Sequence, residues 1–336
     1  MEATMKKYAE RIIRNDVDPH VRDDGRIDGL LLDPTRDEVP LELLGFGIYR
    51  LRSDFAASET KDREMVLVPQ DGAYEVVVNG RKFTGERRGG PFAPGPGRSN
   101  ASAVYVPRGA ALSIRGQGDM AFFSAPALQD REPYQMTSRE VQVVSRGEWV
   151  WRRDVASLIS PQDASSNLVV GETYSPPGLW SGTPLHRHDG AEGVSDESDH
   201  EEVYYHRFQW QKRPGDQFGA YGVQLLMDGQ RLMKAFVISD RSVIAIPGGC
   251  HPVVASPISE LLYLWGLAGS RHELKMKDIT EFAYLKMFEG VFQKLDQEGT
   301  AKRVSAERFR DLCRSFSGEE AKLLAVMLKE KGYVIE

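Results

Sequence analysis

Short apolar runs separated by turn signals fill most of the chain between about residues 41 and 125. They read FGIYRLR, REMVLVPQDG, YEVVVNGRKF, AVYVPRG, AALSIRG and MAFFSAP. Runs of this length, bounded by Gly, Pro and Asn, are typical of antiparallel strands that close into a sandwich or barrel. Asn79-Gly80 is a hairpin signal, because both central positions of a type I′ turn need a positive φ. The pattern predicts an N-terminal β-domain over residues 41–130.

A second series of such runs extends from about residue 141 to 271. It reads VQVVSRG, NLVVGETY, EEVYYHRFQW, YGVQLLMDG, LMKAFVI, SVIAIPGG and LLYLWGLAG. The phrase VYVPRGAA at 104–111 and the phrase IAIPGGCH at 244–251 are both an apolar strand that ends in Pro-x-Gly. This internal similarity predicts a duplicated β-domain, with the second copy over residues 141–276. The polar segment SAPALQDREPYQM between the two blocks has the composition of a linker.

The end of the chain changes from strand to helix periodicity. Residues 277–336 form a predicted helical tail, in which Ser317 and Glu320 make a capping box and Gly332 is a stop signal. Its apolar stripe consists of Leu323, Leu324, Met327 and Leu328. We expect this stripe to pack on the β-core or on a sister subunit, so a homo-oligomer is an open expectation. Residues 1–40 are taken as an N-terminal extension.

Composition narrows the class of protein. The 336 residues are 41% hydrophobic and 27% charged, which suits a globular protein of two domains. A net charge of -6 argues against nucleic acid as a partner. Cys250 and Cys313 are too few for a disulfide framework. The opening MEATMKKYAERIIRND mixes charges through its apolar residues, and no run of about 18 apolar residues occurs, so we expect no signal peptide, no membrane association and a cytoplasmic location.

Four of the seven histidines fall between residues 186 and 206. In the phrase PLHRHD, His186 and His188 are two apart, so in a strand they point to the same face. Such a pair is the geometry of a two-point metal clamp. A lone His-x-His in a β protein is also commonly two surface or hydrogen-bonded histidines, and the pair alone does not decide between these readings.

Further ligands come from two later strands. Glu201 and Glu202 open a strand and face opposite sides, so only one of them can join the pair. His251 follows a turn at the mouth of another strand, where the matching phrase of the first block has Ala111. Three imidazoles and one carboxylate suit a first-row divalent metal such as zinc, manganese or iron. The confinement of the cluster to one of two similar domains favours a functional role.

The quoted motifs resemble a known family. The run GETYSPPGLWSGTPLHRHD, followed by EEVYYHRF and IAIPGGCHPVVASP, resembles the 5-deoxy-glucuronate isomerase family of myo-inositol catabolism, which is related to the pectin-pathway uronate ketol-isomerases. The resemblance extends over about 41–272 through LGFGIYRLR, YVPRGA and WVWRRDVASLI. It implies an all-β fold of two tandem cupin (jelly-roll or β-barrel) domains, with a metal site in the second domain only. The implied ligands are His186, His188, Glu202 and His251, with zinc as the favoured ion and manganese or iron as alternatives.

Two departures from the family fall in strands that are expected to hold the substrate. Where the family usually has a Gln-Arg pair, this chain reads Tyr221-Gly222, and where the family has an Asn in its last core strand, this chain offers Trp265. We expect both positions to face the pocket, with Tyr221 and Trp265 binding substrate. The metal site would then be retained while the substrate has changed.

The family chemistry is the isomerisation of an aldose to a ketose on a deoxy-uronic acid. Tyr204 is the candidate for moving a proton between neighbouring carbons, with a metal-bound hydroxide as the alternative. Arg153, which matches the family's arginine in WRRDV, is the candidate partner of the substrate carboxylate, although a plain salt-bridging arginine is an equally common reading. Cys250 is expected to be a packing residue. His200 and His206 are expected to be surface histidines, with support of the metal ligands or a pH-switch role as the alternative.

Three function classes remain open on the sequence. The first is a metal-dependent isomerase that acts on a small sugar acid, which the resemblance favours. The second is an oxygenase that would use the same ligands with iron. The third is a non-catalytic protein that binds a sugar acid, with the helical tail as a partner surface.

Overall fold

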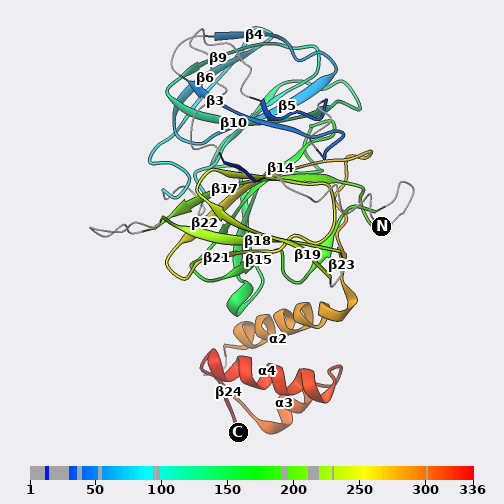
Figure 1. The fold of residues 1–336 in the computed structure, drawn as a ribbon. Helices are drawn as coiled ribbons and strands as arrows, with labels where there is room; N and C mark the ends of the chain where they lie inside the picture. The colour runs from blue at the N-terminus through cyan, green and yellow to red at the C-terminus, as the bar shows by residue number, and fades with distance from the viewer. Residues whose placement is uncertain are drawn as a thin grey trace.

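The computed structural model describes residues 12–14, 30–35, 40–51, 55–93, 95, 99–190, 196–210, 219–228, 231–299 and 302–336. In this part of the chain two β-barrels are stacked on each other, and a group of helices lies below the second barrel (Figure 1). The fold class predicted from the sequence, all-β with two tandem barrels and a helical tail, is confirmed. Among the described residues, no helix combines the length and the apolar character that crossing a membrane requires.

The first barrel consists of two antiparallel sheets. The larger has the strand order β11-β8-β5-β10-β3-β2, and the smaller has the order β4-β9-β6-β7. The strands are β2 (Leu30–Leu32), β3 (Gly45–Leu51), β4 (Phe55–Glu59), β5 (Arg63–Pro69), β6 (Gly72–Val78), β7 (Arg81–Arg87), β8 (Ala103–Val106), β9 (Ala111–Gly116), β10 (Gly118–Pro126) and β11 (Tyr134–Met136). Asn79 and Gly80 join β6 to β7 with φ of 49° and 81°, as a type I′ turn requires.

The second barrel repeats this plan. Its larger sheet has the order β1-β20-β17-β22-β14-β13-β12, its smaller sheet has the order β15-β21-β18-β19, and β16 pairs with β23 beside them. The strands are β1 (Ile12–Arg14), β12 (Gln142–Arg146), β13 (Arg153–Ile159), β14 (Val169–Ser175), β15 (Trp180–Ser181), β16 (His186–Arg187), β17 (Glu201–Gln209), β18 (Tyr221–Asp228), β19 (Arg231–Ser239), β20 (Ser242–Ile246), β21 (Val253–Ala255), β22 (Glu260–Ala268) and β23 (Lys277–Asp278).

The two barrels match strand by strand. The neighbours β8, β5 and β10 of the first large sheet occupy the places of β20, β17 and β22 in the second. The phrases that end in Pro-x-Gly both connect the large sheet of their barrel to its small sheet, one from β8 to β9 and the other from β20 to β21. Ala111 and His251 therefore stand at corresponding places, as the alignment of the two phrases predicted.

Part of the predicted N-terminal extension belongs to the barrels. β1 pairs with β20 at the edge of the second barrel's large sheet, although it precedes the first barrel in the sequence. β2 pairs with β3 in the first barrel, and Leu32 is fully buried there. Both strands are only three residues long, too short to show a period in the sequence. The rest of residues 1–40, including His20, falls mostly outside the described residues.

The two large sheets pack against each other and share one apolar core. Alternation along β17 sends Val203 and Tyr205 into this core, where the Tyr205 ring lies 5.5 Å from that of Phe46 in β3. Gly266 in β22 allows the two sheets to approach closely at this point, because a Cβ atom there would lie 2.4 Å from the ring of Phe123. The intervening residue Tyr204 points the other way, into the interior of the second barrel.

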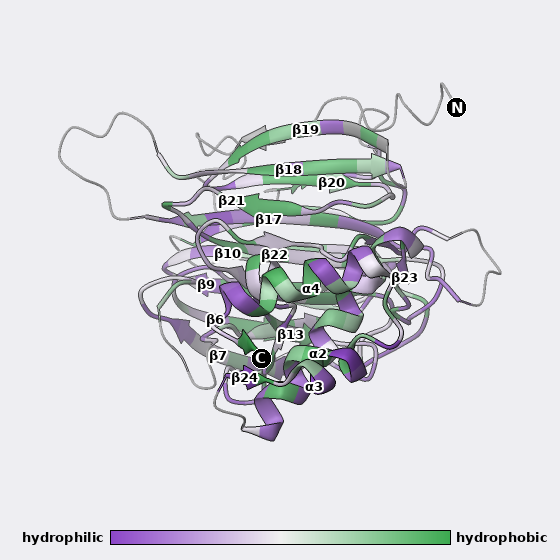
Figure 2. Cartoon of the chain, turned by 90° about the horizontal axis from the view of Figure 1, so that it is seen from below, coloured by the Kyte–Doolittle hydropathy of each residue, from purple (hydrophilic) through white to green (hydrophobic). Residues whose placement is uncertain are grey.

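The tail consists of α2 (Tyr284–Glu298), α3 (Ala306–Leu312) and α4 (Gly318–Glu330), with β24 (Arg303–Val304) parallel to β25 (Val334–Ile335). Each of the longer helices has a hydrophobic and a hydrophilic side (Figure 2). The predicted capping box at Ser317 and Glu320 is present.

The apolar sides of these helices surround Trp151, which ends the 3₁₀ turn η2 (Trp149–Trp151), and Trp180 packs against the same cluster. Leu323 differs from the prediction, because it is 39% exposed while the other three members of the stripe are buried.

Candidate metal centre

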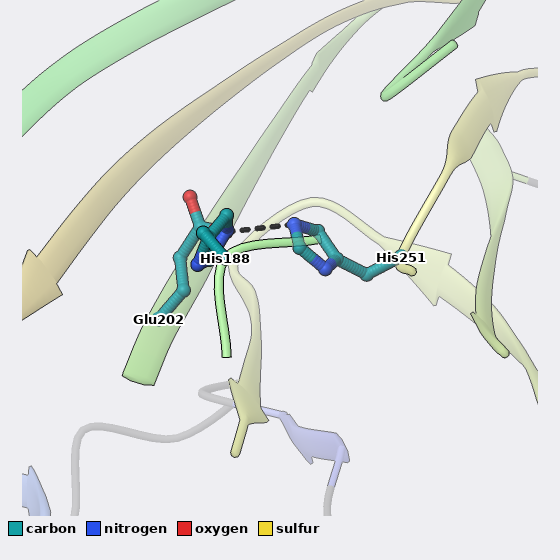
Figure 3. A group of neighbouring side chains, drawn as sticks. All are labelled: His188, Glu202 and His251. Atoms are coloured by element: carbon teal, nitrogen blue, oxygen red, sulfur yellow. Dashed lines mark hydrogen bonds and ion pairs between the residues drawn. The ribbon is translucent and has the colours of Figure 1, made fainter. Parts of the chain in front are cut away.

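Three of the four predicted ligands meet inside the second barrel. The Nε2 atoms of His188 and His251 lie 3.1 Å and 2.8 Å from the same carboxylate oxygen, Oε2 of Glu202. One ligand atom from each residue falls within 4.8 Å of the others, and all three side chains are buried (Figure 3). They come from separate places in the chain: the residue after β16, the second residue of β17 and the turn between β20 and β21. Two imidazoles and a carboxylate are the ligand set of many divalent-metal sites.

The hydrogen bonds around His251 fit a metal ligand. Its Nδ1 lies 2.8 Å from the carbonyl oxygen of Gly249, so Nδ1 carries a proton and donates it. In the neutral imidazole the lone pair is then on Nε2, which faces the Glu202 carboxylate. A lone pair opposite a carboxylate oxygen is repulsive unless a proton or a cation stands between them. The backbone carbonyl thus orients Nε2 as metal-binding histidines require.

The charges of the centre favour an ionised carboxylate. Burial opposes ionisation of Glu202, but the charge of His251 and the hydrogen bond to His188 outweigh it and lower the pKa of Glu202 to about 2. Burial likewise disfavours the charged form of His188, yet the hydrogen bond and the charge of Glu202 prevail and raise its pKa. Glu202 is therefore ionised, and its buried negative charge is balanced either by protonated imidazoles or by a cation bound between the three side chains.

Asp189 connects two of the ligand segments. It follows His188 directly, and its Oδ2 accepts a hydrogen bond of 2.9 Å from the backbone N–H of Gly249 in the turn that leads to His251. Gly248 lies so close to this carboxylate that a Cβ atom would approach Oδ2 to 2.3 Å. Asp189 was not predicted as a site residue. The signal for it in the sequence is its place directly after His188, at the start of the acidic segment.

Gln224 supports His251 from the side of β18. Its Nε2 donates hydrogen bonds of 2.6 Å and 3.1 Å to the carbonyl oxygens of His251 and Pro252. Its Oε1 lies 3.3 Å from Nε2 of His206, whose Nδ1 lies 3.0 Å from the carbonyl oxygen of Ser242. The expected surface position of His206 is wrong, because this side chain is completely buried. His200, also expected at the surface, is 1% exposed and its ring lies 6.2 Å from that of His188.

The fourth predicted ligand, His186, stands beside the three that meet. Its ring centroid is 6.3 Å from that of His251, and its ligand atoms are not part of the compact set. Its Nδ1 donates to the carbonyl oxygen of Pro184 at 2.9 Å, which leaves the lone pair on Nε2. Burial, and next the charge of His251, lower the pKa of His186 to about 4, so its imidazole is neutral at physiological pH.

The predicted catalytic and substrate-binding residues occupy different places. Tyr204 is buried in the barrel interior, with its ring 5.4 Å from that of His251 and 4.4 Å from that of Tyr263. Arg153 donates from Nη1 to the carbonyl oxygens of Thr183 at 2.7 Å and Trp151 at 3.2 Å. Burial lowers the pKa of this guanidinium, and Tyr263 and Tyr204 are among the groups that act on it, so Arg153 lies near the same interior.

Trp265 lies half-buried on the interior face of β22. Its Nε1 donates to Oγ1 of Thr173 at 3.0 Å. The indole covers Gly171, where a Cβ atom would come within 2.3 Å of it. Trp265 therefore lies on the face of β22 that was expected from the sequence, toward the barrel interior.

Tyr221 does not face the pocket, contrary to the prediction. It is 46% exposed, whereas its neighbour Gly222 is buried and Gln224 is fully buried. Because side chains alternate along a strand, the inward positions of β18 are Gly222 and Gln224, and Tyr221 points outward. The departure from the family pattern at Tyr221 therefore lies on the outer face of the barrel.

Comparisons with known proteins agree on one family. The model of the KduI/IolB family matches residues 20–285. The curated 5-deoxy-glucuronate isomerase of Geobacillus kaustophilus (strain HTA426) is 29% identical over 248 residues, covering 72% of this chain and 85% of the relative. The protein of the same name from Bacillus subtilis (strain 168) is 26% identical over 250 residues, covering 73% of this chain and 89% of the relative.

A solved structure supports the fold. The crystal structure of an IolB-like protein from Salmonella typhimurium LT2 superposes with a TM-score of 0.65 at 25% identity, covering 73% of this chain and 90% of the other. The family match ends at residue 285, at the start of α2, so most of the helical tail lies beyond it.

Proposed function

The chain belongs to the KduI/IolB family, and on that premise we propose that it is a metal-dependent isomerase that converts an aldose to a ketose on a deoxy-uronic acid. The first candidate substrate is 5-deoxy-glucuronate, which would give 5-dehydro-2-deoxy-gluconate in myo-inositol catabolism. Support comes from relatives named 5-deoxy-glucuronate isomerase over most of the chain. The predicted cytoplasmic location is part of the same proposal.

One observation carries the metal requirement. His188, Glu202 and His251 place two imidazole nitrogens against one ionised, buried carboxylate in the barrel interior. These residues would hold a divalent cation, with zinc as the first candidate and manganese or iron as alternatives. His186, whose ring centroid is 6.3 Å from that of His251, is the candidate fourth ligand. When bound, the cation would supply positive charge that stabilises the negative charge developing on the carbonyl oxygen of the substrate.

Tyr204 is the proposed proton donor. Burial, and then the charge of Glu202, raise the pKa of its phenol well above the ordinary value, so Tyr204 remains protonated at neutral pH. A protonated phenol beside the ligand His251 can donate to a substrate oxygen, and this role differs from that of a base that removes a proton from carbon. The role expected from the sequence, moving a proton between neighbouring carbons, would require Tyr204 to give up its own proton, and its raised pKa opposes that role.

Arg153 is the proposed partner of the substrate carboxylate. Its guanidinium presents five N–H donors in a fixed fork, and Nη1 makes both of the carbonyl contacts that hold it in place. Trp265 would provide an apolar wall on the β22 side of the same interior. This arrangement suits a small sugar acid whose carbonyl end approaches the metal ligands.

The test is an NMR assay of metal-loaded protein with 5-deoxy-glucuronate and a panel of uronates. We expect turnover by the native protein and its loss in His188→Ala and His251→Ala, together with loss of bound metal. His272→Ala is the matched control, because His272 contacts Ser165 away from the three ligands, and this variant should retain both activity and metal.

Two results would contradict the proposal. No turnover of any uronate by metal-loaded protein would exclude the isomerase, and unchanged metal content in both ligand variants would exclude the centre. Stoichiometric iron with consumption of oxygen would instead support the oxygenase alternative, and metal-dependent binding without turnover would support the sugar-acid binding protein.

A further inference from the structure

Glu201, the residue before the ligand Glu202, binds a backbone segment of the first barrel. Its Oε1 accepts a hydrogen bond of 2.5 Å from the N–H of Glu42, and its Oε2 accepts bonds of 2.9 Å and 3.0 Å from those of Leu43 and Leu44. Three consecutive N–H groups that converge on one carboxylate form a compact anion site, and hydrogen bonds to an ionised group are the stronger kind. We call this arrangement the Glu201 clamp.

The clamp is firmly anchored on the side of the first barrel. Arg63 donates from Nη2 to the carbonyl oxygen of Leu43 at 2.5 Å and to that of Ser124 at 2.8 Å, so the clamped segment is tied to β5 and β10. Leu44 is itself completely buried in the core shared by the two barrels. The segment 42–44 therefore presents its N–H groups in a fixed position.

Successive side chains of a strand point to opposite faces, and β17 uses this alternation at its first two residues. Glu201 reaches outward to the first barrel, and Glu202 reaches inward to His188 and His251. The two carboxylates are attached to adjacent Cα atoms. Fixing one of them therefore limits how far the backbone that carries the other can move.

We infer that Glu201 is a positioning residue for the ligand Glu202, through which the first barrel takes part in the metal centre although it supplies none of the three converging ligands. The inference rests on the proposed metal-dependent function. It gives the first barrel a role in the site, because the start of β17 is held by hydrogen bonds from that barrel at Glu201 as well as by its pairing with β20 and β22.

The chain contains a matched control for this inference. Glu64 of the first barrel makes the reciprocal clamp, in which its carboxylate accepts hydrogen bonds from the N–H groups of Ser166, Asn167 and Leu168 at 2.7, 2.6 and 2.5 Å. Both clamps join the barrels through three consecutive N–H groups. The segment held by Glu64 leads into β14 and contains none of the metal ligands.

The experiment compares full-length Glu201→Gln, Glu64→Gln and Glu202→Gln with the native protein. Zn²⁺ affinity is measured by competition with a chromophoric chelator, and the visible spectrum of Co²⁺-loaded protein reports the coordination geometry. Folding is checked by near-UV circular dichroism at the temperature of the titration. We expect Glu201→Gln to weaken Zn²⁺ binding roughly tenfold and to alter the Co²⁺ spectrum, as loss of a partner behind the ligands does. Glu64→Gln should lower thermal stability and leave affinity within about twofold of native, as expected for a group that supports none of the ligands.

Each alternative outcome has a separate meaning. Native affinity in Glu201→Gln together with lost affinity in Glu202→Gln overturns the positioning role and leaves the metal centre intact. Equal weakening in Glu64→Gln and Glu201→Gln also overturns it, because the effect would then be general loosening of the barrel interface. Native affinity in Glu202→Gln removes the metal assignment and the inference with it.

Discussion

Arg87 and Glu172 form a two-point ion pair across the interface between the two barrels. Nη1 and Nη2 of Arg87 each donate a hydrogen bond of 2.7 Å to one oxygen of the Glu172 carboxylate. Arg87 is 1% exposed and Glu172 is 3% exposed. If one partner were removed, water could not reach the remaining charge to solvate it. The remaining guanidinium contacts, to Asn100 and to the carbonyl oxygen of Pro69, fix Arg87 within the first barrel.

Removal of one partner of this pair should destabilise the protein strongly. We expect Arg87→Met to lower the free energy of unfolding by about 3–5 kcal/mol, because it leaves a buried carboxylate without a counter-charge. The double variant Arg87→Met/Glu172→Leu should lose less than Arg87→Met alone, since no charge is left unpaired. Urea denaturation of the three proteins measures the difference, and a double variant less stable than the single one would contradict the reasoning.

Bound metal should stabilise the fold. A ligand that binds only the native state adds about 2.7 kcal/mol at a free concentration of 100 times its Kd. We therefore expect a chelator to lower the melting temperature of zinc-loaded protein, and added zinc to restore it. The shift should be absent in His251→Ala and present in His272→Ala. A shift of equal size in both variants would mean that the metal acts elsewhere.

Acid should destabilise the protein partly through His206. Burial lowers the pKa of this imidazole to about 4, from an unfolded value near 6.5. Between these two values the unfolded chain binds the proton more readily, so the stability present above pH 6.5 is lost as the pH falls toward 4. The contribution of one such group reaches at most roughly 3 kcal/mol.

The variant His206→Gln checks this origin, because an amide can bond to Ser242 and Gln224 without titrating. The free energy of unfolding should depend less steeply on pH between 6.5 and 4 in this variant than in the native protein. Part of the pH dependence of the free energy of unfolding should remain in this variant, because other buried histidines also take up protons on unfolding. Identical slopes in the two proteins would show that His206 does not take up a proton on unfolding.

Among the polar contacts that hold the helical tail to the second barrel, one lies in an apolar setting. Nε1 of Trp151 donates to Oε1 of Glu289 in α2 at 2.7 Å. Trp151→Phe keeps an aromatic ring in the cluster but removes the donor, so we expect a loss of about 1–3 kcal/mol. Hydrogen exchange of the amides of α2 should become faster, while exchange in β5 and β10 of the first barrel should not change. Uniform acceleration throughout the chain would instead indicate global destabilisation.

The fold could be predicted because its signals are local. Short apolar runs, turn residues and the repeated Pro-x-Gly phrase identify two similar barrels, and their sheets have matching strand orders. The opposite orientation of Glu201 and Glu202 also followed from the period of a strand, and the structure places Glu202 with His188 and His251. Such inferences need only the geometry of one element.

The positions that prediction missed depend on strand register or on distant segments. The run GVQLLM in β18 has no clear alternation of polar and apolar residues, so the sequence did not tell which face Tyr221 occupies. The contact between Glu201 and residues 42–44 joins parts of the chain more than 150 positions apart. Electrostatic contacts of this range leave no periodic trace in the sequence.

The face that the two large sheets share has a consequence for dissecting this protein. Each sheet directs aromatic and aliphatic residues such as Phe46, Phe123 and Tyr205 toward the other sheet. The face that each sheet presents to the other is therefore apolar and unsuited to contact with water. A fragment that began near residue 141 would present this sheet bare to solvent and would tend to self-associate. The barrel that holds the candidate metal centre therefore depends on the other barrel to cover its apolar sheet, and we expect the two to fold as one unit and not as separable modules.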